Sequence, residues 1–298
     1  MPTLNDAHCH FFSDGFFSAL AYQRGRGETP SDLTKELGWE APGSASDLAD
    51  RWVRELDAHG VSRAAIMGSV SRDEAMVAEA VSRHPKRLVG FFMVDPAAAD
   101  AVERTRKGLS EHGLRAVSLF PAMHHVPLHD ARVLRLIEVI SGHPGAAVFV
   151  HCGALSVGVR AKLGLPSRFD LRLGDPLELQ PLATAYPQVP FIVPHFGAGR
   201  FQEALFTADA CPNVYFDTSS SNGWVKYTPG LTLEGVFRTA LNVVGASRLV
   251  FGSDSSFFPR GWQKGVYEEQ RRVLEGLKVA AEDQAMIFGG TFDRLFPA

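Results

Sequence analysis

The fold of this 298-residue chain is limited most by eight short apolar segments. Each segment is followed by a turn and then by a helix-like stretch. The segments are rich in Val, Ile, Leu and Phe and are nearly continuous, which is typical of strands buried on both faces of a parallel sheet. The predicted strands span 3–8, 62–67, 88–94, 115–120, 147–151, 190–194, 214–217 and 248–252.

The intervening stretches supply helices that would cover such a sheet. Residues 46–59 place Leu48, Trp52 and Leu56 at helical spacing behind Ser46 as a predicted N-cap. Further helices are predicted over 73–84, 131–141, 181–186, 201–210, 234–244 and 267–277. Strands alternating with helices predict a (β/α)8 TIM barrel formed by residues 1–298 as a single domain, with an open eight-stranded sheet as the alternative.

The main irregular stretch covers residues 12–44, which are rich in Gly, Pro and polar side chains. We expect it to be a loop insertion over the barrel mouth.

Composition narrows the class of protein. Hydrophobic residues make up 45% and charged residues 21%, and the net charge of −3 gives no basic excess for nucleic acid or an anionic membrane. No apolar run reaches the roughly 18 residues of a membrane helix, and the start lacks a basic-then-apolar leader, so a cytoplasmic location is expected. Cys9, Cys152 and Cys211 lack Cys-x-x-Cys spacing, which argues against a disulfide framework or a cysteine zinc site.

A histidine pair ends the first apolar segment. In a strand, side chains two residues apart lie on the same side, so His8 and His10 converge while Cys9 faces away. Two convergent imidazoles suggest metal binding, although either one could instead be a hydrogen-bonded core histidine.

Three more polar residues follow later predicted strands at the ends where barrel enzymes carry their catalytic groups. His151 ends the fifth, His195 follows the sixth, and Asp254 follows the eighth. Separately, His151 could be bonded within the core, His195 held by a loop, and Asp254 a helix cap. Their convergence with the histidine pair on one face of the barrel favours a single site.

Several motifs along the chain together resemble the amidohydrolase superfamily. More narrowly, they are similar to its amidohydrolase-related (amidohydrolase 2) group, which includes α-amino-β-carboxymuconate-ε-semialdehyde decarboxylase, resorcylate-type decarboxylases and several lactone or amide hydrolases. The motifs are Asp6-Ala7-His8-Cys9-His10, Val150-His151-Cys152-Gly153, Pro194-His195-Phe196-Gly197, Phe251-Gly252-Ser253-Asp254 and the closing stretch 287–296.

The resemblance implies a ligand set for one divalent metal ion: His8, His10, His151 and Asp254. It places His195 beside the reacting water or substrate. Many superfamily members carry a lysine at the end of the fourth strand that becomes carbamylated and bridges two metals. Ser118 stands there in this chain and cannot form the carbamate, so a mononuclear site is expected. A second site using the nearby His124, His125 and His129 stays open as an alternative to ordinary surface histidines.

Three imidazoles and a carboxylate suit Zn²⁺, our first choice, and also accept Mn²⁺, Co²⁺ or Fe²⁺. In a hydrolase of this kind, Asp254 would be both ligand and catalytic proton acceptor, and His195 would orient the water or stabilise the oxyanion. The same groups would also support nonoxidative decarboxylation of a small carboxylated aromatic or muconate-like compound. A catalytically silent metabolite-binding barrel is a third hypothesis.

The substrate pocket is predicted less directly. Arg160 and Arg168 follow His151, whereas Arg260 and Trp262 follow Asp254, and arginine offers bidentate recognition of a carboxylate. These four residues are the predicted substrate contacts for a small, carboxylated amide, ester or lactone. The expected partner is therefore a small molecule rather than nucleic acid or membrane, and the outer helix faces are compatible with a homodimer.

Overall fold

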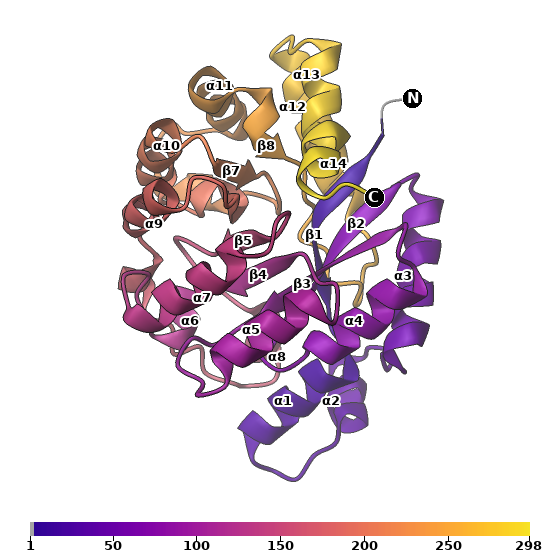
Figure 1. The fold of residues 1–298 in the computed structure, drawn as a ribbon. Coiled ribbons are helices and arrows are strands. Elements are labelled where there is room, and N and C mark those ends of the chain that lie inside the picture. The colour runs from indigo at the N-terminus through magenta and orange to yellow at the C-terminus, as the bar shows by residue number, and fades with distance from the viewer. Residues whose placement is uncertain (1–2) are drawn as a thin grey trace.

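The computed structural model describes residues 3–298, in which eight parallel strands form a ring surrounded by helices (Figure 1). All eight predicted strands are present, with ends shifted by a few residues. They are β1 (Asn5–Phe11), β2 (Arg63–Gly68), β3 (Leu88–Met93), β4 (Ala116–Leu119), β5 (Ala147–Val150), β6 (Phe191–Val193), β7 (Val214–Asp217) and β8 (Leu249–Val250).

The sheet closes because the first strand also bonds to the last. Neighbouring strands pair in chain order from β1 to β8. The Ala7 amide then donates to the Phe251 carbonyl at 2.8 Å, and the Asp254 amide donates to the His8 carbonyl at 2.9 Å. The barrel prediction is thus confirmed, and the open sheet is excluded.

Two hydrophobic layers follow from the alternation of side chains along each strand. One layer fills the barrel interior with residues such as Met67, Phe91 and Phe149, and it includes Phe292 and Phe296 near the C-terminus. The Phe91 and Phe296 rings lie 5.2 Å apart, so the closing segment α14 (Thr291–Leu295) plugs one end of the barrel. The open end of the barrel is therefore the opposite one, where the predicted site residues lie.

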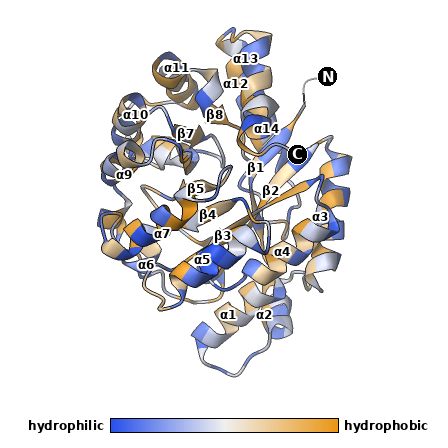
Figure 2. Ribbon diagram, in the orientation of Figure 1, coloured by the Kyte–Doolittle hydropathy of each residue, from blue (hydrophilic) through white to orange (hydrophobic). Residues whose placement is uncertain are grey.

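The second layer lies between the strands and the outer helices, whose inner faces are apolar and outer faces polar (Figure 2). Within residues 3–298, each helix is too short or too polar to cross a membrane. The outer helices are α3 (Ala45–Ala58), α4 (Glu74–Arg83), α5 (Ala101–Ser110), α6 (Pro121–His124), α7 (Ala131–Ser141), α8 (Gly158–Lys162), α9 (Gln180–Ala185), α10 (Phe201–Ala210), α11 (Leu233–Val244), α12 (Lys264–Gly276) and α13 (Ala281–Ala285).

Two details of the helix prediction are corrected. The N-cap of α3 is Ser44, not Ser46, because Ser44 and Asp47 form a reciprocal capping box. Helix α5 was not predicted, since its exposed face is dominated by charged residues and only a narrow stripe is buried.

The prediction that residues 12–44 form a loop is wrong. This insertion contains helices α1 (Asp14–Arg24) and α2 (Pro30–Leu37). Three of the Gly and Pro residues that suggested a loop are helix boundaries. Pro30 is the first residue of α2 behind the capping residue Thr29, and Gly25 and Gly38 end the helices with φ angles of 66° and 67°. The two helices project at the end of the barrel away from the N-terminus (Figure 1).

Candidate metal centre and adjoining cavity

A cluster of three ligand-type side chains lies at the open end of the barrel. His8 and His10 come from β1, and Asp254 comes from the turn after β8, where its backbone has a φ angle of 60°. One ligand atom from each of the three lies within 4.8 Å of the others. The predicted convergence of the two strand ends is therefore present in the structure.

The orientation of His10 is set by Ser69, which follows β2. The Ser69 hydroxyl donates to the Met67 carbonyl, so it accepts a hydrogen bond from His10 Nδ1 at 2.8 Å. His10 Nε2 is then the ring nitrogen that faces the site, and it lies 3.1 Å from Asp254 Oδ1.

The orientation of His8 is set by Asp217 at the end of β7. His8 Nδ1 lies 2.7 Å from Asp217 Oδ2, and both side chains are buried. Burial alone would lower the pKa of His8, but the charge and hydrogen bond of Asp217 outweigh it and raise this pKa to about 9. His8 Nε2 is buried without a hydrogen-bond partner among the described residues and lies 3.6 Å from Asp254 Oδ1.

These contacts direct His8 Nε2, His10 Nε2 and the Asp254 carboxylate towards one another. Burial would raise the pKa of Asp254, but the hydrogen bond with His10 and the nearby His8 and His195 hold it well below its usual range. The carboxylate is therefore ionised at neutral pH. With a pKa of about 9, His8 is protonated at neutral pH, and its Nε2 side faces the Asp254 carboxylate. A divalent cation would displace that proton and bind both groups, so the donor set fits a metal ion.

His151 and His195 line the same cavity but lie outside the three-residue cluster. The ring centroids of His151 and His195 are 5.5 Å apart, and His195 stacks on His8 at 5.2 Å. Burial, assisted by His195 and His8, lowers the pKa of His151 well below its usual range. His151 is thus neutral, its buried Nδ1 has no partner among residues 3–298, and it is available as a further ligand.

The tautomer of His195 is defined by Ser219. His195 Nδ1 lies 3.2 Å from the Ser219 carbonyl, which can only accept, so Nδ1 carries the proton and Nε2 has the lone pair. The Ser219 hydroxyl donates to Asp217 and lies 2.9 Å from the same Nδ1. Burial lowers the pKa of His195, so its ring is neutral near pH 7. The residue itself has a left-handed backbone, with φ of 55°.

Asp6 holds the two ligand-bearing segments together. Asp6 Oδ1 accepts from the amides of His8 at 2.9 Å and Ser253 at 3.0 Å, and Oδ2 accepts from Trp262 Nε1 at 2.6 Å. Trp262 is only 3% exposed and does not line the cavity. The structure therefore places this tryptophan outside the cavity lining, as a hydrogen-bond donor to Asp6.

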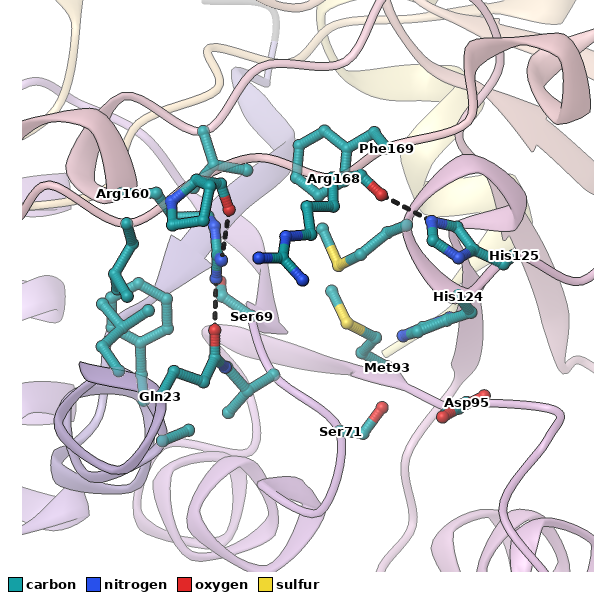
Figure 3. Close-up of a pocket in the computed structure, with 18 residues that line it drawn as sticks. Gln23, Ser69, Ser71, Met93, Asp95, His124, His125, Arg160, Arg168 and Phe169 are labelled. Atoms are coloured by element: carbon teal, nitrogen blue, oxygen red, sulfur yellow. Dashed lines mark hydrogen bonds between the residues drawn. The ribbon is translucent and has the colours of Figure 1, made fainter. Parts of the chain in front are cut away.

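Two cavities meet at this end of the barrel. The metal chamber, about 610 Å³, is lined by the four histidines and Asp254 discussed above, and also by Arg260. The distal chamber, about 630 Å³, is lined by α1 and by the segments after β2, β3, β4 and β5, including Arg160 and Arg168 (Figure 3). The two chambers share five lining residues: Phe16, Ser69, Met93, Met123 and Val157.

The three histidines after β4 do not form a second metal cluster within residues 3–298. His125 Nε2 binds the Arg168 carbonyl at 2.5 Å, His129 is exposed beside Glu178, and His124 lines the distal chamber. Ser118 is fully buried on β4.

The sequence predictions omitted the residues that orient the ligands, namely Asp217, Ser219 and Ser69. Asp217 is the last residue of a correctly predicted strand, so the rule that functional groups follow barrel strands, applied to β7, would have found it. Only Gly fits nearby at position 252, because a Cβ there would lie 2.6 Å from Asp217 Oδ1 and 2.8 Å from His8 Cβ.

The sequence model of the family described as "Amidohydrolase" matches residues 6–298. Among curated proteins, Protein fluG of Emericella nidulans is 26% identical over 205 residues, which are 64% of this chain and 22% of fluG. The chain thus spans about a fifth of the length of that relative.

Solved structures with the same fold cover nearly all of the chain. The 5-carboxyvanillate decarboxylase LigW from Sphingomonas paucimobilis superposes with a TM-score of 0.67 at 14% identity over 99% of both chains. An amidohydrolase from Burkholderia multivorans with bound zinc gives a TM-score of 0.66 at 16% identity over 98% of both chains. At these identities the two matches establish the common fold.

Proposed function

Because this chain belongs to the amidohydrolase family, we propose that it is a mononuclear metal-dependent hydrolase of a small, carboxylated amide, ester or lactone. The observation that carries the proposal is the convergence of His8 Nε2, His10 Nε2 and the ionised Asp254 carboxylate on one point of the cavity wall. Each imidazole is fixed by a hydrogen bond at its other nitrogen, as in protein metal sites.

The proposed ligands are His8, His10, His151 and Asp254. A divalent ion bound there would lower the pKa of a coordinated water from 15.7 to about 7 and polarise a substrate carbonyl. Zn²⁺ is the preferred ion for imidazole and carboxylate ligands, and zinc is bound in the related Burkholderia multivorans structure. Ser118 in place of a carbamylated lysine supports a single ion.

Two side chains of the metal chamber would move or direct protons. Asp254 is ionised and accepts the proton of the attacking water, then returns it to the leaving group. His195 is neutral and presents its Nε2 lone pair to the cavity, so it accepts a hydrogen bond from that water and orients it.

The state of His195 suits the orientation of a water molecule better than it suits proton donation to carbon. Protonating the carbon that loses carbon dioxide needs an acid, and a neutral ring with Nδ1–H bound to Ser219 has no proton to give from Nε2. Decarboxylation, the activity named for LigW, remains the second candidate because the metal-binding residues serve both reactions.

A substrate carboxylate would be held by arginine. Arg260 lines the metal chamber and forms no ion pair with any residue in 3–298, so its guanidinium is available for a bidentate contact. Arg160 already binds Gln23 Oε1 at 2.5 Å and the Pro166 carbonyl at 2.8 Å, which makes it a clamp between α1 and the loop after β5.

The proposal is tested by metal analysis of the purified protein and a screen of lactones, amides and carboxylated phenols. We expect about one equivalent of metal, with loss of turnover on chelation and its recovery with Zn²⁺. Product analysis separates the two reactions, since hydrolysis consumes water and decarboxylation releases carbon dioxide. Active protein without metal would overturn the proposal, and metal-loaded protein that turns over nothing in the screen would favour a silent binding barrel.

A His195→Gln variant identifies the role of that residue. We expect turnover to fall by roughly 10²-fold or more while the metal content is unchanged, because the ring orients water and is not a ligand. Equal loss of turnover and metal would make His195 a ligand instead.

A further inference from the structure

The lining of the distal chamber includes polar atoms that have no hydrogen-bond partner among residues 3–298. Ser71 Oγ and His124 Nδ1 are buried and make no hydrogen bond to any residue in 3–298. Both residues line this chamber, which adjoins the metal chamber (Figure 3). Buried polar atoms are almost always bonded in folded proteins, so a pair of unbonded atoms beside a cavity indicates groups that a ligand satisfies.

Two oppositely charged side chains line the same chamber and form no ion pair with any residue in 3–298. Asp95 follows β3, and one of its oxygens accepts from the Ala97 amide at 2.9 Å. Arg168 is fixed through its carbonyl by His125, while its guanidinium extends into the cavity (Figure 3). Neither side chain forms an ion pair within the described part of the chain.

We propose that the distal chamber binds the zwitterionic head group of an α-amino acid. Arg168 would hold the carboxylate in a bidentate contact and Asp95 the ammonium group, with Ser71 and His124 as further hydrogen-bonding partners. The substrate would then be an amino-acid derivative whose head group lies in the distal chamber and whose side chain carries the scissile carbonyl. The placement of the scissile carbonyl in the metal chamber rests on the proposed function, whereas the head-group site in the distal chamber does not.

The charge pattern discriminates among ligand classes. A simple carboxylate would pair with Arg168 but leave Asp95 unpaired, and a simple amine would do the reverse. A second carboxylate would face the Asp95 carboxylate, which is unfavourable. Only a ligand carrying both charges pairs both side chains.

The boundary between the two chambers is mostly apolar. Phe16, Met93, Met123 and Val157 line both cavities, and Leu20 and Leu165 extend the apolar wall in the distal chamber. The head group and the reacting carbonyl would be joined across this apolar stretch, where methylene groups are favourably buried.

Three probes of matched chain length test the head-group site by calorimetry on the intact, metal-loaded protein: L-norleucine, hexanoate and pentylamine. We expect L-norleucine to bind about tenfold or more tightly than either single-charge probe, because hydrogen bonds to charged groups contribute most to such recognition. Equal affinity for hexanoate and L-norleucine would overturn the zwitterion assignment, as would absence of L-norleucine binding.

Single substitutions test the roles of Arg168 and Asp95 separately. Arg168→Gln should weaken L-norleucine and hexanoate by about tenfold each without weakening pentylamine, and Asp95→Asn should weaken L-norleucine and pentylamine without weakening hexanoate. Arg172→Gln and Asp100→Asn are matched controls on the same loops, and their side chains do not line the chamber. Variants that affect all three probes alike would contradict the assignment.

The outcome is independent of the catalytic proposal. Metal content should be unchanged in Arg168→Gln and Asp95→Asn, because neither residue belongs to the metal cluster. Failure of the proposed hydrolase would show as absence of metal or turnover with L-norleucine binding intact. Failure of the head-group site would show as loss of probe discrimination in a protein that still binds metal.

Discussion

The candidate metal ligands of the metal chamber and two charged side chains of the adjoining distal chamber differ in the partners that the protein gives them. In the metal chamber, His8, His10 and His195 each have one nitrogen fixed by a partner, namely Asp217, Ser69 and Ser219. In the distal chamber, Arg168 and Asp95 face the cavity without ion-pair partners among residues 3–298.

The difference follows from what each chamber would bind. A metal ion requires ligands at fixed distances and angles, so the protein orients them in advance through a second set of hydrogen bonds. A substrate head group brings its own donors and acceptors, and the chamber needs only complementary charges at its wall. Preorganised and unpaired polar groups are thus the expected signs of the two kinds of site.

The largest expected effect comes from Asp254→Asn in the metal chamber. Turnover should fall by roughly 10²- to 10⁴-fold, because the amide cannot accept the proton of the attacking water. L-norleucine binding in the distal chamber should be unchanged, which would show that the two chambers act independently. Steady-state kinetics on a substrate from the screen and calorimetry measure the two effects, and turnover above a tenth of the wild-type rate would refute the assigned role.

Asp73→Asn tests the packing of α1, which forms a wall of both chambers. Asp73 is 3% exposed and accepts a hydrogen bond from Ser13, the N-cap of α1, at 2.6 Å. Burial raises its pKa from 3.8 to about 7. The unfolded chain ionises this group near pH 4 but the folded chain does so only near pH 7, so its contribution to stability falls as pH rises between these values.

The Asn variant cannot ionise and should lose this dependence. Its free energy of unfolding should match that of the wild type near pH 4 and exceed it at pH 8 by up to about 4 kcal/mol, at 1.36 kcal/mol per pKa unit. Urea unfolding of both proteins from pH 4 to 8 measures the difference. A difference that does not vary with pH would contradict the raised pKa of Asp73.

Asp217→Asn tests preorganisation in the metal chamber. Metal affinity should drop by roughly 10- to 100-fold, because His8 loses the carboxylate that fixes its ring and increases its basicity. Competition with a chelator measures the change, and Asp209→Asn on the exposed face of α10 is the matched control. An affinity equal to that of the control would show that His8 needs no such support.

Ser69→Ala should have the smallest effect, although Ser69 lines both chambers. His10 is 22% exposed, so water can replace the lost hydroxyl as acceptor for Nδ1–H, and we expect metal affinity to fall less than about tenfold. The same chelator competition applies, and Ser82→Ala is the control. A loss as large as that of Asp217→Asn would mean that the solvent exposure of a ligand does not reduce the cost of removing its hydrogen-bond partner.

Local sequence patterns determined the barrel and the core of the site. Continuous apolar runs predicted each of the eight strands, because a strand buried on both faces must be apolar at every position. The two-residue repeat of a strand brought His8 and His10 together, and the strand-end rule placed His195 and Asp254 at the same face.

The tertiary structure alone decided what surrounds those residues. Trp262 resembled a pocket residue in the sequence, but the folded chain directs its indole N–H to Asp6, which lies 256 positions away. The helices of the insertion, the Asp217 contact to His8 and the unpaired Arg168 and Asp95 likewise depend on segments far apart in the chain. Strand periodicity is a short-range property of the backbone, whereas hydrogen-bond partners and cavity walls arise only when loops from different strands pack together.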